Sequence, residues 1–112
     1  MLILFDHSTP APLASYLTEH SVTKAKDRGW DRLSNGDLLS EAEKAGYDLL
    51  LTADNNMRYQ QNLTDRKIAL VVLSTPQWPR VQLHIDKITA VINSVKPGGY
   101  AEVDIPYSKK PA

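Results

Sequence analysis

The sequence predicts an α/β protein, a three-layer α/β/α sandwich with a mostly parallel sheet. Three short apolar runs, at Leu2–Phe5, Asp48–Thr52 and Ile68–Leu73, lack the polar alternation of half-exposed strands. Strands buried on both faces of a sheet have this pattern. Segments with helical spacing of apolar residues separate the runs, and such alternation builds a parallel sheet with helices on its faces. We expect at least four strands, with Leu2–Phe5 near the centre of the sheet.

Three segments are expected to be helices. Pro10–His20 has two leucines four residues apart and prolines suited to a first turn. Gly36–Ala45 has one apolar face, with Asn35 as its expected N-cap. Pro79–Val95 has the longest apolar stripe, which predicts the longest helix of the protein.

Two further segments alternate in the manner of strands. Ser21–Lys26 is expected to be an additional strand, and Tyr100–Ile105 a final edge strand that Pro106 stops. A chain of 112 residues has room for one domain. We expect this domain to span residues 1–106, with a frayed tail over residues 107–112.

Composition excludes several classes of protein. The chain has no cysteine, which rules out disulfide scaffolds, thiolate zinc sites and cysteine nucleophiles. Its 13 basic and 13 acidic residues give a net charge of zero, unlike the strongly basic proteins that coat DNA. No apolar run approaches the ~20 residues of a membrane helix, and the first residues lack the pattern of a signal peptide. We therefore expect a cytoplasmic protein without a membrane partner.

Carboxylates stand where the predicted strands end. Asp6 follows the first strand, Asp54 follows the strand at Asp48–Thr52, and Asp37 lies in the first turn of the intervening helix. Functional crevices of parallel α/β sheets lie beyond the carboxyl ends of the strands. Grouped carboxylates repel one another unless a cation compensates them, and hard ions such as Mg²⁺ or Mn²⁺ prefer oxygen ligands. The three acids therefore predict a metal site, with their carboxyl groups roughly 4–8 Å apart.

Each acid also has a purely structural interpretation. Asp6 is placed to cap a helix, Asp37 to interact favourably with a helix dipole, and Asp54 to form an Asx turn.

The order of these motifs resembles the small bacterial PIN-like domains. The resemblance consists of Leu4-Phe5-Asp6 followed by a proline, of Asn35-Gly36-Asp37-Leu38-Leu39 opening a helix, and of an apolar strand that ends in Thr52-Ala53-Asp54. It extends over roughly residues 1–95. PIN domains are Mg²⁺-dependent nucleases, and many bacterial members are the toxins of toxin–antitoxin pairs that cut RNA.

The resemblance implies a Mg²⁺- or Mn²⁺-dependent ribonuclease in which Asp6, Asp37 and Asp54 bind the ion and carry the catalysis. RNA and an antitoxin protein are the implied partners, and a homodimer remains open. Ser8 and Thr9 are placed to donate hydrogen bonds to the phosphate, and Arg58 to offset negative charge in the transition state. The segment from Lys24 to Arg32 mixes basic residues with Trp30, which suits either RNA binding or a solvated edge with a packed tryptophan.

Two alternative functions remain open. His7 and Asn56 stand where related PIN domains often have further acids, which favours a catalytically silent PIN-like interaction module as the first alternative. The second is a receiver-type phosphoacceptor domain, since Asp6, Asp54 and Ser74 or Thr75 occupy comparable strand ends. Receivers also need a lysine after the fifth strand, and the nearest here is Lys109 in the tail.

Overall fold

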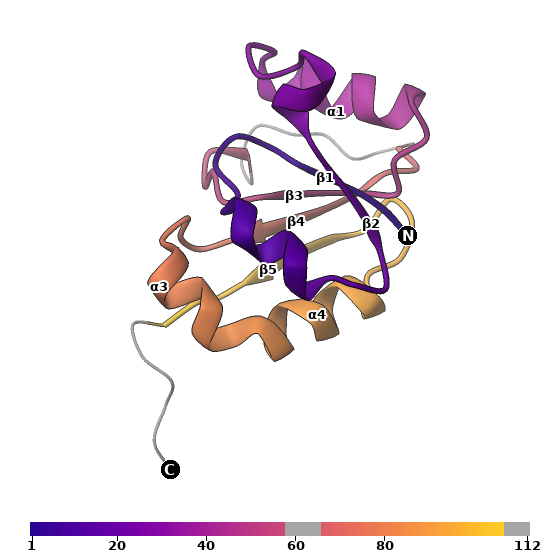
Figure 1. The fold of residues 1–112 in the computed structure, drawn as a ribbon. Coiled ribbons are helices and arrows are strands. Elements are labelled where there is room, and N and C mark those ends of the chain that lie inside the picture. Colours follow the sequence, from indigo (N-terminus) through magenta and orange to yellow (C-terminus); the bar gives the residue numbers. More distant parts are fainter. Residues whose placement is uncertain (58–65, 107–112) are drawn as a thin grey trace.

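Five parallel strands form one sheet in the computed structural model, which describes residues 1–57 and 66–106 (Figure 1). Across the sheet the order is β2 (Ser21–Lys24), β1 (Leu2–Phe5), β3 (Leu49–Thr52), β4 (Ala69–Leu73) and β5 (Tyr100–Val103). The predicted fold class is confirmed. The middle position belongs to β3 rather than to β1, which lies one place from the edge because β2 pairs on its outer side.

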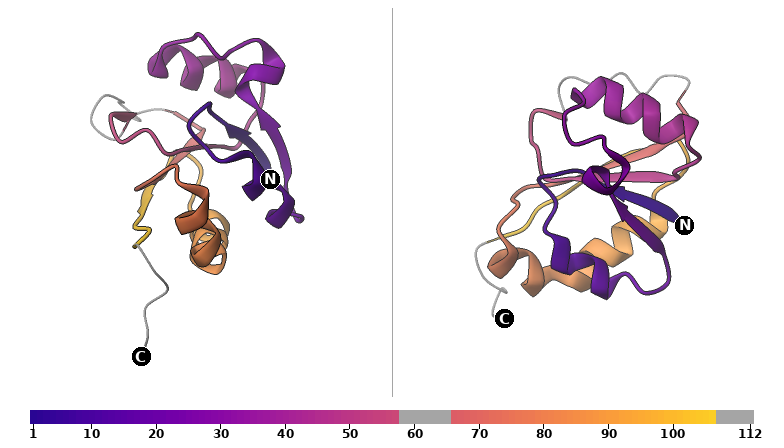
Figure 2. Two further views of the ribbon diagram at one scale, coloured as in Figure 1. Left: turned by 60° about the vertical axis from the view of Figure 1, so that its left-hand side comes forward. Right: turned by 45° about the horizontal axis from the view of Figure 1, so that its top comes forward.

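Helices cover both faces of the sheet, as the two further views in Figure 2 also show. The helix α1 (Asn35–Lys44) lies on one face. The opposite face carries the 3-10 helix η1 (Ala11–Tyr16) and the run formed by α3 (Trp78–Val81), the 3-10 helix η3 (Gln82–His84) and α4 (Ile85–Ser94).

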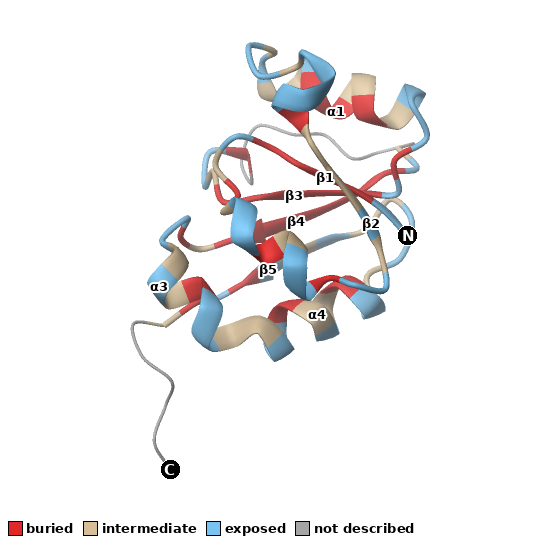
Figure 3. Ribbon diagram, in the orientation of Figure 1, coloured by how far each residue is buried: buried red, intermediate tan, exposed pale blue. Residues whose placement is uncertain are grey.

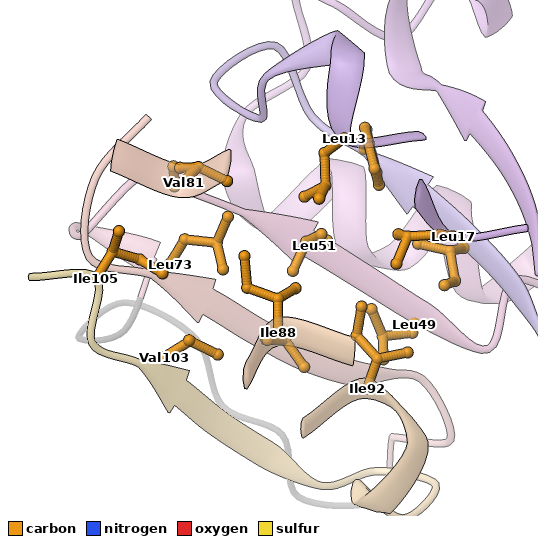
Figure 4. Close-up of a cluster of buried hydrophobic side chains, with 14 of the residues drawn as sticks. Leu13, Leu17, Leu49, Leu51, Leu73, Val81, Ile88, Ile92, Val103 and Ile105 are labelled. Atoms are coloured by element: carbon orange, nitrogen blue, oxygen red, sulfur yellow. The ribbon is translucent and has the colours of Figure 1, made fainter. Parts of the chain in front are cut away.

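Each face has its own hydrophobic core. Leu50 of β3 joins the core under α1 with Leu39, whereas Leu49 and Leu51 point to the other face and pack with Ile88 of α4 (Figure 4). All five side chains are fully buried. Figure 3 shows the same distribution along the strands, with β3 and β4 buried throughout and the edge strand β2 only partly covered. Burial on both faces is the reason these strands lack polar alternation.

Two of the predicted helices differ from the observed ones. The segment Pro10–His20 forms only the short 3-10 helix η1, with Pro10 at its N-cap and Pro12 in its first turn. Its hydrogen bonds instead join residues three apart, as from the Leu13 N–H to the Pro10 carbonyl (3.1 Å). The segment Pro79–Val95 is interrupted at η3, where His84 leaves helical geometry (φ −128°, ψ 30°).

The chain returns to β4 through a contact with the end of α1. The carboxylate of Glu43 accepts hydrogen bonds from the backbone N–H groups of Lys67 (2.5 Å) and Ile68 (3.3 Å) and lies 3.5 Å from the Arg66 guanidinium. The Lys67 hydrogen bond, helped by the Ile68 hydrogen bond and by the positive charges of Arg66 and Lys67, lowers the pKa of Glu43 against the opposing effect of burial. These bonds fasten residues 66–68 to α1 before β4 begins.

Candidate functional site at the carboxyl ends of β1 and β3

The strand order places a topological switch point between β1 and β3. From this adjacent pair the sheet extends outward through β2 on one side and β4 on the other. Ligand sites of doubly wound α/β sheets lie at such switch points, beyond the carboxyl ends of the strands. Asp6 directly follows β1 and Asp54 lies two residues after β3, so both lie, as predicted, where the carboxyl ends of the strands form one edge of the sheet.

Asp6 is a buried carboxylate held by its own loop and by β3. Its side chain is 4% exposed. One oxygen, Oδ1, accepts hydrogen bonds from the Ser8 N–H (3.1 Å) and the Ser8 hydroxyl (2.7 Å), and lies 2.9 Å from the Thr9 hydroxyl. The other, Oδ2, accepts a hydrogen bond of 2.5 Å from the Thr52 hydroxyl. A carboxylate has about four acceptor positions, so donors of the protein fill or nearly fill those of Asp6.

Thr52 connects the two aspartates. Its hydroxyl donates to Asp6 and accepts a hydrogen bond of 3.0 Å from the backbone N–H of Asp54, and the residue is fully buried. The sequence marked this threonine as part of a motif but did not reveal the bridge. The pairing of β1 with β3 explains it, because Phe5 is opposite Leu51, and Asp6 and Thr52 are the next residues of the two strands.

The Asp54 carboxylate points toward its own turn and toward α1. Oδ1 accepts a hydrogen bond from the Asn56 N–H (2.9 Å), which is the Asx turn of the structural interpretation. Oδ2 accepts a hydrogen bond from the Asn35 side-chain amide (3.3 Å). Asn35 was expected to cap α1, but Ser34 does so by accepting a hydrogen bond from the Asp37 N–H (3.3 Å). Within the described part of the chain, two acceptor positions of Asp54 remain open.

Asp37 does not join the other two acids in a metal-binding group. It is an exposed residue in the first turn of α1, where an acid interacts favourably with the helix dipole. Within residues 1–57 and 66–106, no three or more His, Cys, Asp or Glu side chains are arranged to hold a metal ion. Within the described residues, Asp6, Asp37 and Asp54 are therefore not arranged as the three-carboxylate group expected from the sequence.

The other predicted site residues have different positions. Ser8 donates to Asp6, and its hydroxyl accepts the Ala53 N–H (2.9 Å). The buried Thr9 hydroxyl lies 2.9 Å from Asp6 and 2.6 Å from the Leu51 carbonyl, and its single proton serves one of these acceptors at a time. Both hydroxyls therefore hold the loop after β1. Arg58 lies outside the described residues.

The geometry limits how a divalent ion fits this edge. Asp6 has little or no acceptor capacity left, whereas Asp54 keeps two positions. Mg²⁺ in proteins is commonly held by one or two carboxylates and completes its coordination with water and substrate phosphate. The edge fits an ion of that kind bound mainly at Asp54, and it does not fit a centre of three carboxylates.

A cleft of about 350 Å³ lies beside Asp6 on the β2 side. Its walls are the loop after β1 and the end of β2, and its polar lining residues are Asp6, His7, Ser8, Thr9, Lys24 and Lys26. A second cleft of about 310 Å³ lies on the β5 side and is lined by Asn55, Val72, Ser74, Glu102, Val103 and Asp104. The charged residues that line the first cleft are two lysines and Asp6, and those that line the second are Glu102 and Asp104.

Comparisons with protein-family models, with curated proteins and with solved structures found no match for this chain. Among the helices of the described residues, none has the length and apolar character needed to span a membrane.

Proposed function

We propose that the protein hydrolyses RNA at the carboxyl ends of β1 and β3, in a reaction that depends on Mg²⁺ or Mn²⁺. One observation carries the proposal: two aspartates from separate strands reach the switch point of the sheet, joined through the Thr52 hydroxyl. The resemblance of the sequence to PIN-like domains supports the same chemistry. It also supports a role as the toxin of a toxin–antitoxin pair, with an antitoxin protein as partner.

The residues of the edge have distinct roles in this proposal. Asp54 holds the ion, since its carboxylate has open acceptor positions. Asp6 fixes Thr52 and Ser8 and thereby the backbone around Asp54. Asn35 orients the Asp54 carboxylate from α1. When bound, a divalent ion polarises the scissile phosphate and lowers the pKa of an attacking water.

A cleavage assay with labelled single-stranded RNA tests the proposal. We expect Asp54→Asn to lower the rate by about a hundredfold, on the order of 3 kcal/mol, because the amide provides no charge for the ion. Asp31→Asn, an exposed acid without a hydrogen bond to the described residues, is the matched control and should retain the wild-type rate. Asp37→Asn should also retain it, because Asp37 stands apart from the edge. Calorimetric titration with Mn²⁺ should show binding that Asp54→Asn removes.

A catalytically silent interaction module is the second candidate. The observation that favours it is the near-complete hydrogen bonding of Asp6 by the protein itself. Wild-type protein that binds RNA but cleaves none of it with either ion would establish this candidate in place of the nuclease.

A phosphoacceptor role is the third candidate. The strand order β2-β1-β3-β4-β5 is also that of receiver domains, in which an aspartate after β3 is phosphorylated. Phosphorylation of Asp54 by acetyl phosphate would establish this function instead.

A further inference from the structure

The cleft on the β2 side of Asp6 contains two cationic side chains that have no partner among the described residues. Lys24 is the last residue of β2 and lies opposite Phe5, which directly precedes Asp6. The strand expected over Ser21–Lys26 ends there, and Lys26 lies in the 3-10 helix η2 (Ala25–Arg28). Neither ammonium group forms an ion pair or hydrogen bond with a described residue. Within the described chain, both positive charges are therefore available to a ligand in the cleft.

The segment that carries these lysines is anchored on both sides. Ala25 between them is buried in the core under α1. After Lys26, the Arg28 guanidinium lies 4.4 Å from the centre of the Trp30 ring and donates a hydrogen bond of 3.2 Å to the Tyr47 hydroxyl. Trp30 itself packs against the same core, as the structural interpretation of this segment predicted. The turn after β2 is thus held in place before any ligand binds, which reduces the entropy cost of binding.

The charges along the edge differ from one end to the other. The cleft at the β2 end is lined by Lys24 and Lys26 together with the hydrogen-bonded carboxylate of Asp6, whereas the cleft at the β5 end is lined by Glu102 and Asp104. A polyanion is therefore attracted more strongly to the first cleft than to the second, although the chain has no net charge.

We propose that the cleft on the β2 side is the binding site for the backbone of a single-stranded RNA, with Lys24 and Lys26 contacting successive phosphates. This inference rests on the proposed function and adds the direction of approach. The strand reaches Asp54 from the β2 side and does not continue across the β5 side. His7, which is exposed on the wall of the same cleft, lies next to this path.

Fluorescence anisotropy with labelled single-stranded RNA in the presence of EDTA measures binding without cleavage. We expect the double variant Lys24→Gln/Lys26→Gln to bind about tenfold more weakly at 0.1 M salt, because two phosphate contacts are lost. The slope of log affinity against log salt should fall by about 1.4, which is about 0.7 for each lost contact to a single strand. Thermal unfolding should be unchanged, since neither side chain has an ion-pair or hydrogen-bond partner among the described residues.

The matched control is Lys67→Gln/Lys96→Gln, which removes the same charge from a cleft at the amino ends of the strands. This control should bind RNA as the wild type does. Equal losses in both double variants would overturn the inference, because they would indicate attraction by net charge alone. Displacement of the RNA by polyglutamate as effectively as by unlabelled RNA would also overturn it and would indicate a general anion site.

The two proposals can fail separately. RNA binding that depends on Lys24 and Lys26 but leads to no cleavage would retain the binding path and reject the nuclease. Cleavage that is unaffected in the double variant, with unchanged affinity, would retain the nuclease and reject the path. Wild-type protein that binds no RNA would reject both.

Discussion

Asp6 and Asp54 follow similar strands but have different surroundings. Asp6 is surrounded by donors from Ser8, Thr9 and Thr52, whereas Asp54 shares its carboxylate between one turn and one amide of α1. An ionised group that is buried and fully hydrogen-bonded organises its neighbours, and one with open acceptor positions is available to a ligand. The two aspartates should therefore respond differently to substitution.

Replacement of Asp6 should destabilise the protein. In Asp6→Ala the hydroxyls of Thr52 and Ser8 lose a charged acceptor at a buried position, and we expect a loss of about 3 kcal/mol in the free energy of unfolding. Asp54→Ala should lose less than about 1 kcal/mol, since its carboxylate is partly exposed. Urea denaturation of both variants and of Asp31→Ala measures the difference. Equal losses for Asp6→Ala and Asp31→Ala would contradict the network described here.

Glu43 should make stability depend on pH. Its pKa in the folded protein lies below the usual 4.5 of a glutamate, so the unfolded chain takes up the proton first as the pH falls. The stabilisation is fully present above the unfolded pKa and is lost as the pH falls through the folded pKa. In Glu43→Gln this contribution is absent. The difference in unfolding free energy between wild type and variant should therefore be largest near neutral pH and shrink well below pH 4.5; a constant difference would argue against it.

Single residues show which parts of the site the sequence could predict. The position of Asp6 and Asp54 at one edge followed from strand ends alone, because parallel strands end on the same side of a sheet. The Thr52 bridge depends on register and on side-chain rotamers, which no sequence pattern records. Ser34 caps α1 in place of Asn35, so the helix begins one residue earlier than predicted. The Asn35 side chain donates a hydrogen bond to Asp54 instead of capping the helix.

At the scale of elements, apolar spacing predicted which face of each segment is buried but not how regular its backbone is. Val81, Ile88 and Ile92 face the sheet on both sides of the break at η3, so the stripe continues although the helix does not. In η1 the two prolines suit the start of a helix, but they did not indicate whether that helix is α or 3-10.

The loop before β5 should tolerate no side chain at Gly98. Its φ is +72°, and a Cβ there would lie 2.4 Å from the Arg66 carbonyl oxygen. We expect Gly98→Ala to cost about 3 kcal/mol, from backbone strain and displacement of the loop at residue 66 together. Gly29→Ala is the control, because Gly29 has a φ of +74° with no atom near the added Cβ. It should show the backbone strain alone, about 1 kcal/mol in thermal or urea unfolding; equal costs would show that the loops can separate freely.

For the whole molecule, the unbroken apolar runs predicted a sheet covered on both faces, and the two cores confirm it. Strand order was beyond the sequence, because β1 and β3 are similarly apolar and nothing in their composition says which lies in the middle.

Adjacent residues of β3 should be equally important for stability. Leu50 and Leu51 point to opposite faces and are both fully buried. We expect Leu50→Ala and Leu51→Ala to cost about 3 kcal/mol each in urea unfolding. Leu83→Ala, at a leucine that is 37% exposed, should cost less than about 1 kcal/mol. A small effect at either Leu50 or Leu51 would mean that one face of the sheet is open.

The order of pairing has a consequence during synthesis on the ribosome. Each strand after β1 pairs with one already made, and always at a free edge: β2 and β3 flank β1, β4 joins β3, and β5 joins β4. No strand has to be inserted between two others, so the sheet can grow as the chain emerges. Until Tyr100–Val103 has left the exit tunnel, however, the wholly apolar β4 forms the open edge. A nascent chain that stalls before β5 has emerged exposes β4 as an unpaired strand prone to aggregation. Pairing with the more polar β5 removes this exposed apolar edge.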